Sequence, residues 1–390
     1  MINNNIEKKL AEVGLKVPNI LLPNKDIDYS KFSCIAADQY TQDISYWEKV
    51  KKYVGDSPSA LNLIYPEAEL EQIIDDKENF DSILSNRIEN INANMEKYLK
   101  DKIYEDIGKC FVYVERKNDD AIRKGLIVAI DIEKYDYNNG AKTLMRATEK
   151  TVIERLKVRK KIRKNASLDM PHIMVLIDDK QDKLFSAIKK MDLANDDKNK
   201  LYDFDLMFES GHLTGYRISN EKFIEDILDV LIDLKNNSID DFLYAVGDGN
   251  HSLAAAKDVY SETGRGRYAL IEIVNLYDEG LKFYPIHRLV YGISKEKFKN
   301  ETGVDADKPL PLQDMQKVLD EKGYKIDYIH GKEECLKLAE DNNNTAIVYD
   351  KFSTDTLFND VINNGSLCRK SFSMGNAKDK RFYLEAQKIL

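Results

Sequence analysis

The sequence FLYAVGDGNHSLAAAK, residues 242–257, contains the pattern that sets the fold class. It begins with an apolar run of strand length, FLYAV, which the letters GDG interrupt. An alanine-rich run of strong helix formers follows, and Asn250 or Ser252 could cap its first turn. The order of strand, glycine turn and helix predicts an α/β protein in which the turn, residues 247–252, lies at the amino end of a helix.

This turn has the composition of an anion site. The first N–H groups of a helix and the positive end of its dipole attract phosphate or carboxylate, and glycines let a ligand approach the backbone. Asp248 and His251 add groups that can transfer protons, and Asp248 could also bind Mg²⁺. A purely structural turn needs only glycines and one cap, so the additional polar residues favour a site. The groups expected to contact phosphate are Gly247, Gly249, Asn250 and Ser252.

Phosphoryl transfer also needs cations that stabilise the developing charge. Candidates elsewhere in the chain are Arg265, Arg267, His287, Arg288 and Lys370. For Arg288 two alternatives stay open, because an internal carboxylate such as Glu272 could pair with it instead of a ligand. Residues 146–163 form a basic, helix-like run, which predicts either a solvated face or a patch that binds an anion.

Composition narrows the class of protein. The net charge of -9 with 33% charged residues indicates an acidic surface, which argues against a nucleic-acid partner. The four cysteines have no CxxC spacing and fit free thiols in a reducing compartment. The first residues lack the apolar core of a signal peptide, and no apolar run of about 18 residues occurs. We therefore expect a cytoplasmic protein without a membrane span.

The length of 390 residues predicts two or three domains. Residues 1–106 are expected to wrap onto the rest and to include a long helix over 67–104, where apolar residues follow a helical period. Residues 107–292 are expected to form a mixed α/β core that carries the glycine turn. Residues 293–390 alternate between helix and strand patterns and predict a small α/β lobe with a C-terminal tail.

The letters GDGNHSLAAAK, followed by YPIHRLV at 284–290, resemble the bacterial domain-of-unknown-function family number one thousand and fifteen. The resemblance covers nearly the whole chain. That family is in turn similar to the ParB/sulfiredoxin superfamily, which includes free-serine kinases, sulfiredoxin and nucleotide-hydrolysing ParB proteins. The resemblance implies a mixed-sheet ParB/sulfiredoxin-like core, preceded by a helical segment and followed by a small α/β lobe.

The resemblance also implies roles for individual residues. Asp248, Asn250 and His251 fall on the D, H and H of the D-G-H-H-R signature that the kinases carry at a phosphate-binding turn. Ser252 stands where the signature has arginine, and a serine cannot replace a guanidinium group on phosphate. Either another cation supplies the charge, or phosphate binds differently, or phosphoryl transfer has been lost. Asp38 falls roughly where the kinases place an acidic residue near the substrate, which implies a catalytic role.

Together these features predict a protein that binds ATP or ADP with Mg²⁺ and transfers a phosphoryl group to a small hydroxylated metabolite such as free serine. A first alternative is a non-catalytic module that binds and senses a nucleotide or a phosphorylated metabolite. A weaker alternative is a ParB-like DNA-associated protein, which the net charge of -9 disfavours. The expected partners are thus a nucleotide and a small-molecule substrate, and the oligomeric state is left open.

Overall fold

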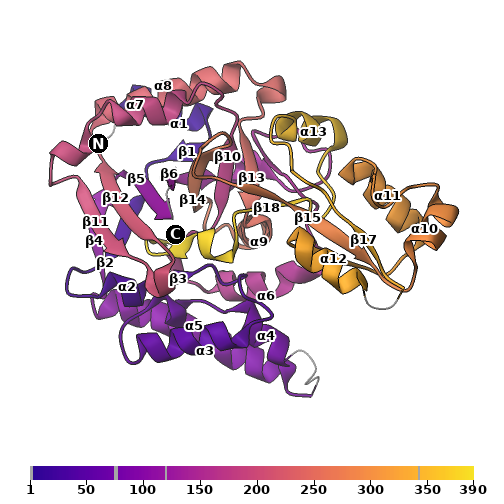
Figure 1. Cartoon of the computed structure of the whole chain (residues 1–390). Helices are drawn as coiled ribbons and strands as arrows, with labels where there is room; N and C mark the ends of the chain where they lie inside the picture. Colours follow the sequence, from indigo (N-terminus) through magenta and orange to yellow (C-terminus); the bar gives the residue numbers. More distant parts are fainter. Residues whose placement is uncertain (1–2, 74–77, 119–120, 341–342) are drawn as a thin grey trace.

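The computed structural model describes residues 3–73, 78–118, 121–340 and 343–390. Over these ranges the chain forms one large mixed sheet with helices on both faces, and a smaller lobe of sheet and helices stands at one side (Figure 1). The expected mixed α/β class is therefore confirmed. None of the helices described in these ranges is long and apolar enough to cross a membrane.

The large sheet has ten strands, nine of which follow one path. Strands β11 to β14 of this path pair antiparallel, whereas β10 runs parallel to β14 and β13 runs parallel to β8. In order across the sheet the strands are β11 (Lys200–Asp205), β12 (His212–Ile218), β5 (Phe111–Asn118), β6 (Ala121–Asp131), β14 (Tyr268–Asn275), β10 (Met174–Ile177), β13 (Tyr244–Asp248), β8 (Met145–Ala147) and β7 (Tyr135–Asp136). The tenth strand, β1 (Leu15–Lys16), pairs with the end of β6.

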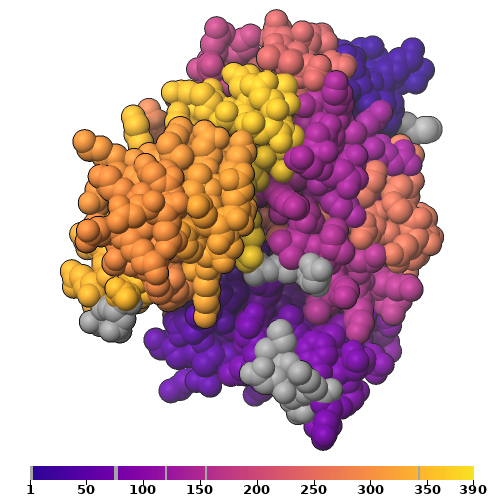
Figure 2. All heavy atoms as spheres, turned by 90° about the vertical axis from the view of Figure 1, so that its right-hand side faces the viewer, coloured from indigo at the N-terminus to yellow at the C-terminus, as the bar shows by residue number. Residues whose placement is uncertain are grey.

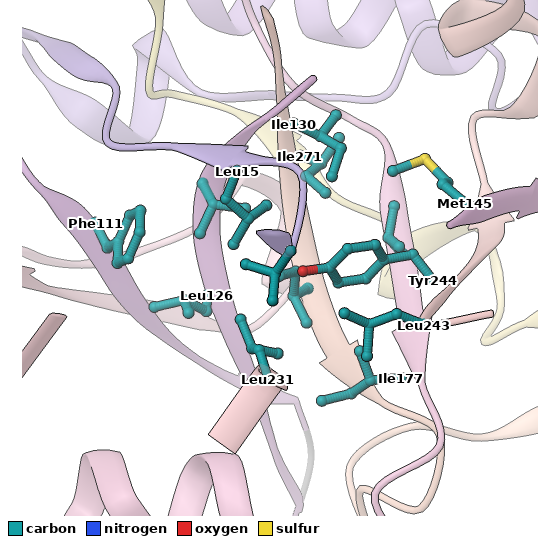
Figure 3. Close-up of a cluster of buried hydrophobic side chains, with 14 of the residues drawn as sticks. Leu15, Phe111, Leu126, Ile130, Met145, Ile177, Leu231, Leu243, Tyr244 and Ile271 are labelled. Atoms are coloured by element: carbon teal, nitrogen blue, oxygen red, sulfur yellow. The ribbon is translucent and has the colours of Figure 1, made fainter. Parts of the chain in front are cut away.

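One face of this sheet is covered by α1 (Asn4–Glu12), α7 (Lys183–Lys189) and α8 (Glu221–Asn236), which lie together at the top of Figure 1. Helix α8 begins after Asn220, whose side chain accepts hydrogen bonds from the N–H groups of the first turn. Its apolar stripe joins inward-facing strand residues in one buried cluster. Figure 3 shows part of this cluster, in which Tyr244 of β13 lies among aliphatic side chains.

The opposite face is covered by the N-terminal segment, which forms a second buried cluster around Trp47. Its helices and strands are β2 (Asn19–Pro23), α2 (Tyr29–Phe32), β3 (Cys34–Ile35), α3 (Ile44–Val54), α4 (Glu67–Ile73), α5 (Phe80–Lys100) and β4 (Tyr104–Lys109). The long helix expected over 67–104 is thus seen as α4 and α5, and residues 74–77 lie outside the described ranges.

The basic run of residues 146–163 is helical only in its second part. Helix α6 (Ile153–Lys164) begins later than expected, because the preceding residues form strand β8, which pairs with β13. A backbone that is committed to a sheet ladder cannot also form helical hydrogen bonds. The charged residues at the start of the run therefore do not predict whether it forms a helix or a strand.

The C-terminal lobe is built around β15 (Phe283–Val290), a strand that the sequence placed at the end of the core. In space β15 pairs with three strands of the lobe, β16 (Ile326–His330), β17 (Thr345–Ile347) and β18 (Phe372–Met374). In Figure 2 the lobe, in orange, stands above the N-terminal segment, in indigo to purple. Its helices are α10 (Lys295–Thr302), α11 (Leu312–Lys322), α12 (Lys332–Glu340) and α13 (Leu357–Asn364).

The tail after β18 leaves the lobe and returns to the large sheet. Two short strands anchor it, since β19 (Phe382–Tyr383) pairs with β3, and β20 (Gln387–Lys388) pairs with β9 (Leu168–Asp169). Directly before β19, Arg381 is buried and its Nη1 donates to Glu272 Oε2 of β14 at 2.5 Å. The tail thereby runs between the sheet and the N-terminal segment, next to the glycine turn.

Candidate functional site

The glycine turn joins β13 to α9 (Asn250–Thr263), as the sequence predicts. The capping prediction is wrong, because the N-cap is Gly249, and neither Asn250 nor Ser252 caps the helix. Gly249 has φ 81°, a left-handed conformation that favours glycine, and its carbonyl accepts hydrogen bonds from the N–H groups of Ser252 and Leu253. The helix therefore starts without a side-chain cap, so the side chains of its first turn are left for other contacts.

Asp248, the last residue of β13, forms an ion pair with Lys380 of the tail. Lys380 Nζ lies 3.1 Å from Asp248 Oδ2, and the other carboxylate oxygen accepts the N–H of Gly249 at 3.0 Å. Lys380 is 7% exposed, so its ammonium group is held in place by the surrounding protein. The turn thus has a cation beside it that sequence reasoning did not identify.

His172, just before β10, links the start of α9 to the tail. Its Nε2 lies 3.0 Å from Ser252 Oγ, and its Nδ1 lies 3.0 Å from the hydroxyl of Tyr383. That hydroxyl also accepts the N–H of Ala37 at 3.3 Å, which ties the N-terminal segment into the same cluster. Burial lowers the pKa of His172, although Asp38 opposes this shift. The imidazole is therefore neutral near pH 7.

Asp38 follows β3 and faces the same cluster. Burial alone would raise the pKa of its carboxyl, but His172, Arg159 of α6 and a hydrogen bond from Gln39 outweigh burial and lower it to about 2. Arg159 Nη2 lies 3.9 Å from Asp38 Oδ2 and forms a closer ion pair with Glu67. Asp38 is accordingly an ionised carboxylate in a largely enclosed, charged environment.

These side chains line one end of a cavity of ≈ 600 Å³. Its volume falls in the range of about 300–1,000 Å³ that is usual for small-molecule sites. The polar end consists of Asp38, Glu67, Arg159, His172, Ser252 and Tyr383. Away from this end the lining is mostly apolar and includes Leu70, Leu84, Met95, Ile162 and Met170. Asp248 and Lys380 are not part of this lining, although Lys380 is near enough to Asp38 to help lower the pKa of its carboxyl.

The polar cluster lies beside the glycine turn, whose sequence resembles that of the family named above. A family model tests that resemblance directly. The model described as "Protein of unknown function (DUF1015)" matches residues 21–370. The chain belongs to this family. No curated protein matches the chain.

Several solved structures match this DUF1015 protein, and three of them are described here. In each of the three the match covers most of the solved chain. A free serine kinase in complex with AMP matches at a TM-score of 0.34 and 10% identity, over 69% of this chain and 92% of that one. A conserved hypothetical protein from Pyrococcus furiosus matches at 0.32 and 13%, over 65% and 90%. SbnI with a C-terminal truncation, from Staphylococcus aureus, matches at 0.33 and 12%, over 64% and 83%. The likeness is loose and concerns fold, so function has to be argued from the residues of this chain.

Two of the catalytic residues expected from the sequence of this DUF1015 protein, Asp38 and Asp248, lie near the same two groups. Both carboxylates act on the pKa of His172, and Lys380 pairs with Asp248 and helps to lower the pKa of Asp38. His251 points differently. Its Nε2 accepts the N–H of Val152 at 3.2 Å, so this nitrogen is occupied and faces the loop before α6. The acid or base role expected of His251 is therefore not supported by its contacts. Asn250 Oδ1 is buried and has no hydrogen-bond partner within the described ranges.

Two of the predicted cations lie at the wrong end of α9. Arg265 and Arg267 follow its last residue, and a helix of 14 residues spans about 21 Å. Arg267 is engaged there by Asp131, at 2.7 Å, and by Glu133, at 2.8 Å. Arg265 is exposed. The expectation that either residue supplies charge to the turn is wrong, because sequence proximity to the motif put them one helix length away.

Three further predicted phosphate contacts lie in or beside the lobe. The Arg288 guanidinium is buried and donates to the backbone carbonyls of Ile286, Arg369 and Lys370, and within the described ranges it forms no ion pair with Glu272. His287 Nδ1 accepts the N–H of Tyr349. Both side chains have partners within the protein, which does not favour the phosphate contact expected of them.

Lys370 and Lys380 both lie near His330. Partial burial, followed by the charges of Lys370 and Lys380, lowers the pKa of His330 to about 4, which places both lysines near that ring. The backbone N–H of Lys370 is held by the Glu149 carboxylate at 3.2 Å. Its role in binding phosphate stays a prediction.

No group of three or more His, Cys, Asp or Glu side chains that could hold a metal ion occurs among the described residues. Both oxygens of Asp248 already have partners in Lys380 and Gly249. Mg²⁺ is commonly bound by one or two carboxylates together with phosphate oxygens and water. Asp248 as a metal ligand thus stays a prediction that requires a bound nucleotide to complete the site.

Proposed function

We propose that this protein binds a nucleotide at the amino end of α9 and transfers a phosphoryl group to a small hydroxylated metabolite such as free serine. One observation supports this most. Two carboxylates and two cations, Asp38, Asp248, Arg159 and Lys380, come from four separate segments and meet beside a cavity of suitable size. Structural ion pairs alone do not require a cavity.

The phosphates would lie at the start of α9. Gly249 leaves this helix end without a side-chain cap, and its dipole favours negative charge. Lys380 and Arg159 would then supply the positive charge that the resemblance assigned to an arginine at the position of Ser252. Lys380 is well suited to this, since it would exchange one anionic partner, Asp248, for another.

The base would occupy the apolar part of the cavity. Leu84, Met95 and Ile162 offer apolar contact there, and the polar cluster around Asp38 and His172 lies at the other end. This division matches a ligand that has an aromatic base at one end and charged groups at the other.

Asp38 would orient the hydroxyl of the acceptor. As an ionised carboxylate it can accept a hydrogen bond from that hydroxyl and receive its proton as the oxygen attacks phosphorus. Its low pKa makes it a weak base, so most of the catalysis would come from position and from the surrounding charges. Mg²⁺, when bound, would be held by Asp248 with phosphate oxygens and would neutralise charge on them.

A non-catalytic sensor is the second candidate. It is favoured by the contacts of Asp248, whose two oxygens are both engaged within the protein, and by Ser252, which lacks the charge of the family arginine. Such a site would bind nucleotide without turning it over.

Calorimetric titration of the purified chain with ATP and ADP, with and without Mg²⁺, tests the binding step. We expect micromolar binding, weakened at least tenfold in Arg159→Gln and in Lys380→Met. Arg265→Gln is the matched control, since it removes an exposed arginine from the far end of the same helix. Absence of binding by wild type would overturn the proposal.

Incubation with nucleotide, Mg²⁺ and a panel of hydroxylated amino acids, with products identified by mass spectrometry, tests the chemical step. We expect a phosphorylated amino acid with wild type, formed about 10²–10⁴-fold more slowly with Asp38→Asn. Binding that is not followed by any product would support the sensor instead.

A further inference from the structure

The first turn of α9 also contains a serine in contact with a histidine. Ser252 Oγ lies 3.0 Å from His172 Nε2, a distance at which the hydroxyl can donate to the imidazole. Ser252 precedes the buried alanines of α9, and its hydroxyl makes no cap, so it is directed at His172 and away from the helix backbone. A serine that is paired with a histidine in this way has the arrangement of an activated nucleophile.

The rest of the imidazole is held as such a base requires. With a proton on Nδ1, His172 donates to the hydroxyl of Tyr383 at 3.0 Å, which leaves the lone pair of Nε2 for Ser252. Asp38 lies close enough to His172 to oppose the lowering of its pKa, and would stabilise the imidazolium that forms when the serine loses its proton. The ring is thus oriented on one side and has a carboxylate charge nearby.

Both residues face a space that can hold a substrate. Ser252 and His172 line the cavity of ≈ 600 Å³, and the lining beyond them is mostly apolar. A neutral, compact substrate with an apolar acyl or aryl group fits that lining. Arg159 lines the same polar end and supplies positive charge for an oxyanion.

We propose that Ser252 is a covalent nucleophile activated by His172, and that this cavity hydrolyses small apolar carboxylic esters. Ser252 Oγ attacks the carbonyl carbon as its proton passes to His172 Nε2. The bond from that carbon to the alcohol oxygen breaks, and the proton on His172 leaves with the alcohol. Water then attacks the acyl-serine, gives its proton to His172 and releases the acid, while the serine oxygen takes the proton back.

This activity goes beyond the proposed nucleotide function and requires neither nucleotide nor metal. It shares the polar end of the cavity with that function, but its chemistry depends on Ser252. The phosphates are assigned to Arg159 and Lys380. The two proposals can therefore fail separately. Calorimetry tests nucleotide binding, and labelling tests the reactivity of Ser252.

The test is labelling with an alkyl fluorophosphonate, which phosphonylates activated serines, in the absence of nucleotide. We expect one adduct per chain on intact mass analysis, located on Ser252 by peptide mapping. Ser252→Ala should abolish it, and His172→Gln should slow it at least a hundredfold. Hydrolysis of p-nitrophenyl butyrate should fall in parallel in both variants.

Two controls make the result specific. Ser261 lies on the exposed side of α9 and donates to the carbonyl of Lys257, so Ser261→Ala should leave labelling unchanged. His212 is a surface histidine between Asp203 and Asp205, and His212→Gln should also have no effect. Thermal unfolding of each variant verifies that it is folded. Tyr383→Phe removes the hydroxyl that partners Nδ1 and that also accepts the N–H of Ala37, and it should slow labelling about tenfold.

The proposal is overturned if folded wild type is not labelled, or if the adduct lies on other serines. Labelling of Ser252 that persists at the wild-type rate in His172→Gln and in Tyr383→Phe would also overturn it, because the histidine would then have no part in activation.

Discussion

Lys380 Nζ lies 3.1 Å from Asp248 Oδ2, so a residue of the C-terminal tail supplies the cation at the glycine turn. The tail can do this because it leaves the lobe and pairs with β3 beside the turn. The turn and the tail are thereby in direct contact, and a change in one is expected to affect the other.

Replacing this cation should weaken nucleotide binding without unfolding the protein. A charged hydrogen bond is worth about 1.5–3 kcal/mol, so Lys380→Met is expected to raise the dissociation constant of MgADP by about tenfold to a hundredfold. Lys388 is exposed on the same tail and provides the control, since Lys388→Met should leave binding unchanged. Equal affinities of wild type and Lys380→Met in calorimetric titration would remove Lys380 from the site.

Asp38→Asn should separate binding from turnover. The change keeps the size of the side chain but removes the negative charge that would orient the acceptor hydroxyl. We expect kcat to fall by about 10²–10⁴-fold with a change in nucleotide affinity of less than about threefold. Asp26→Asn, on the exposed loop before α2, is the matched control.

The same variant should alter the pH dependence of stability. The pKa of Asp38 is about 2 in the folded protein and 3.8 as a free side chain, so ionised Asp38 stabilises the fold above about pH 4. That contribution is lost as the pH falls through the range between these values. Urea unfolding at pH 7 and pH 3 should show a larger loss for wild type than for Asp38→Asn. Identical losses would mean that Asp38 is not held in a charged environment.

Glycine is required at position 249 by conformation and by space. Gly249 has φ +81°, and a Cβ there would lie 3.0 Å from the Ile173 Cα. Gly264, at the other end of α9, has φ +71° but nothing within 4 Å of such a Cβ. The left-handed conformation costs about 1–2 kcal/mol for an ordinary residue. Gly264→Ala should therefore destabilise by about that much, and Gly249→Ala by at least about 1 kcal/mol more. Equal unfolding free energies of the two variants would contradict this reasoning.

Local pattern was enough to predict the elements and the turn. The strand, glycine turn and helix around residues 242–257 are confirmed, since apolar runs, glycines and alanines act over a few residues.

The site depends on contacts that pattern does not encode. His172, Lys380 and Tyr383 are distant from the turn in sequence, and no motif surrounds them. They reach it because the tail pairs with β3 and because β10 lies beside β13. Arg265 was chosen because it is near the motif in sequence, whereas Arg159 was visible only as one charge in a basic run. Tertiary pairing, which a single sequence does not reveal, decided which cation faces the site.

Two buried tyrosines should respond in opposite ways to loss of the hydroxyl. The Tyr244 hydroxyl is buried in the apolar cluster of Figure 3 and has no hydrogen-bond partner in the described part of the chain. The Tyr202 hydroxyl is also buried but donates to the Glu385 carboxylate. Tyr244→Phe should be neutral or stabilise by about 1 kcal/mol, whereas Tyr202→Phe should destabilise by about 1.5–3 kcal/mol. Urea unfolding of both variants tests this, and a large loss in Tyr244→Phe would imply a partner such as bound water.

Arg381 should control the stability of the tail, and through it the site. Its guanidinium is buried between Glu272 and Glu385, and Arg123 also approaches Glu272, at 3.4 Å. Arg381→Met would leave two buried carboxylates with too little positive charge, which costs about 3–5 kcal/mol when one partner of a buried ion pair is removed. Urea unfolding should show this loss.

A second substitution distinguishes charge from packing at the same position. In Arg381→Met/Glu272→Gln one of the uncompensated charges is also removed, so part of the lost stability should return. If the double variant is no more stable than Arg381→Met, the arginine acts through packing alone. Lys380→Met, one residue away and outside this cluster, removes a single ion pair and should lose less stability than Arg381→Met, while the dissociation constant of MgADP rises about tenfold to a hundredfold. That contrast would establish that Arg381 holds the tail in place and Lys380 acts on the ligand.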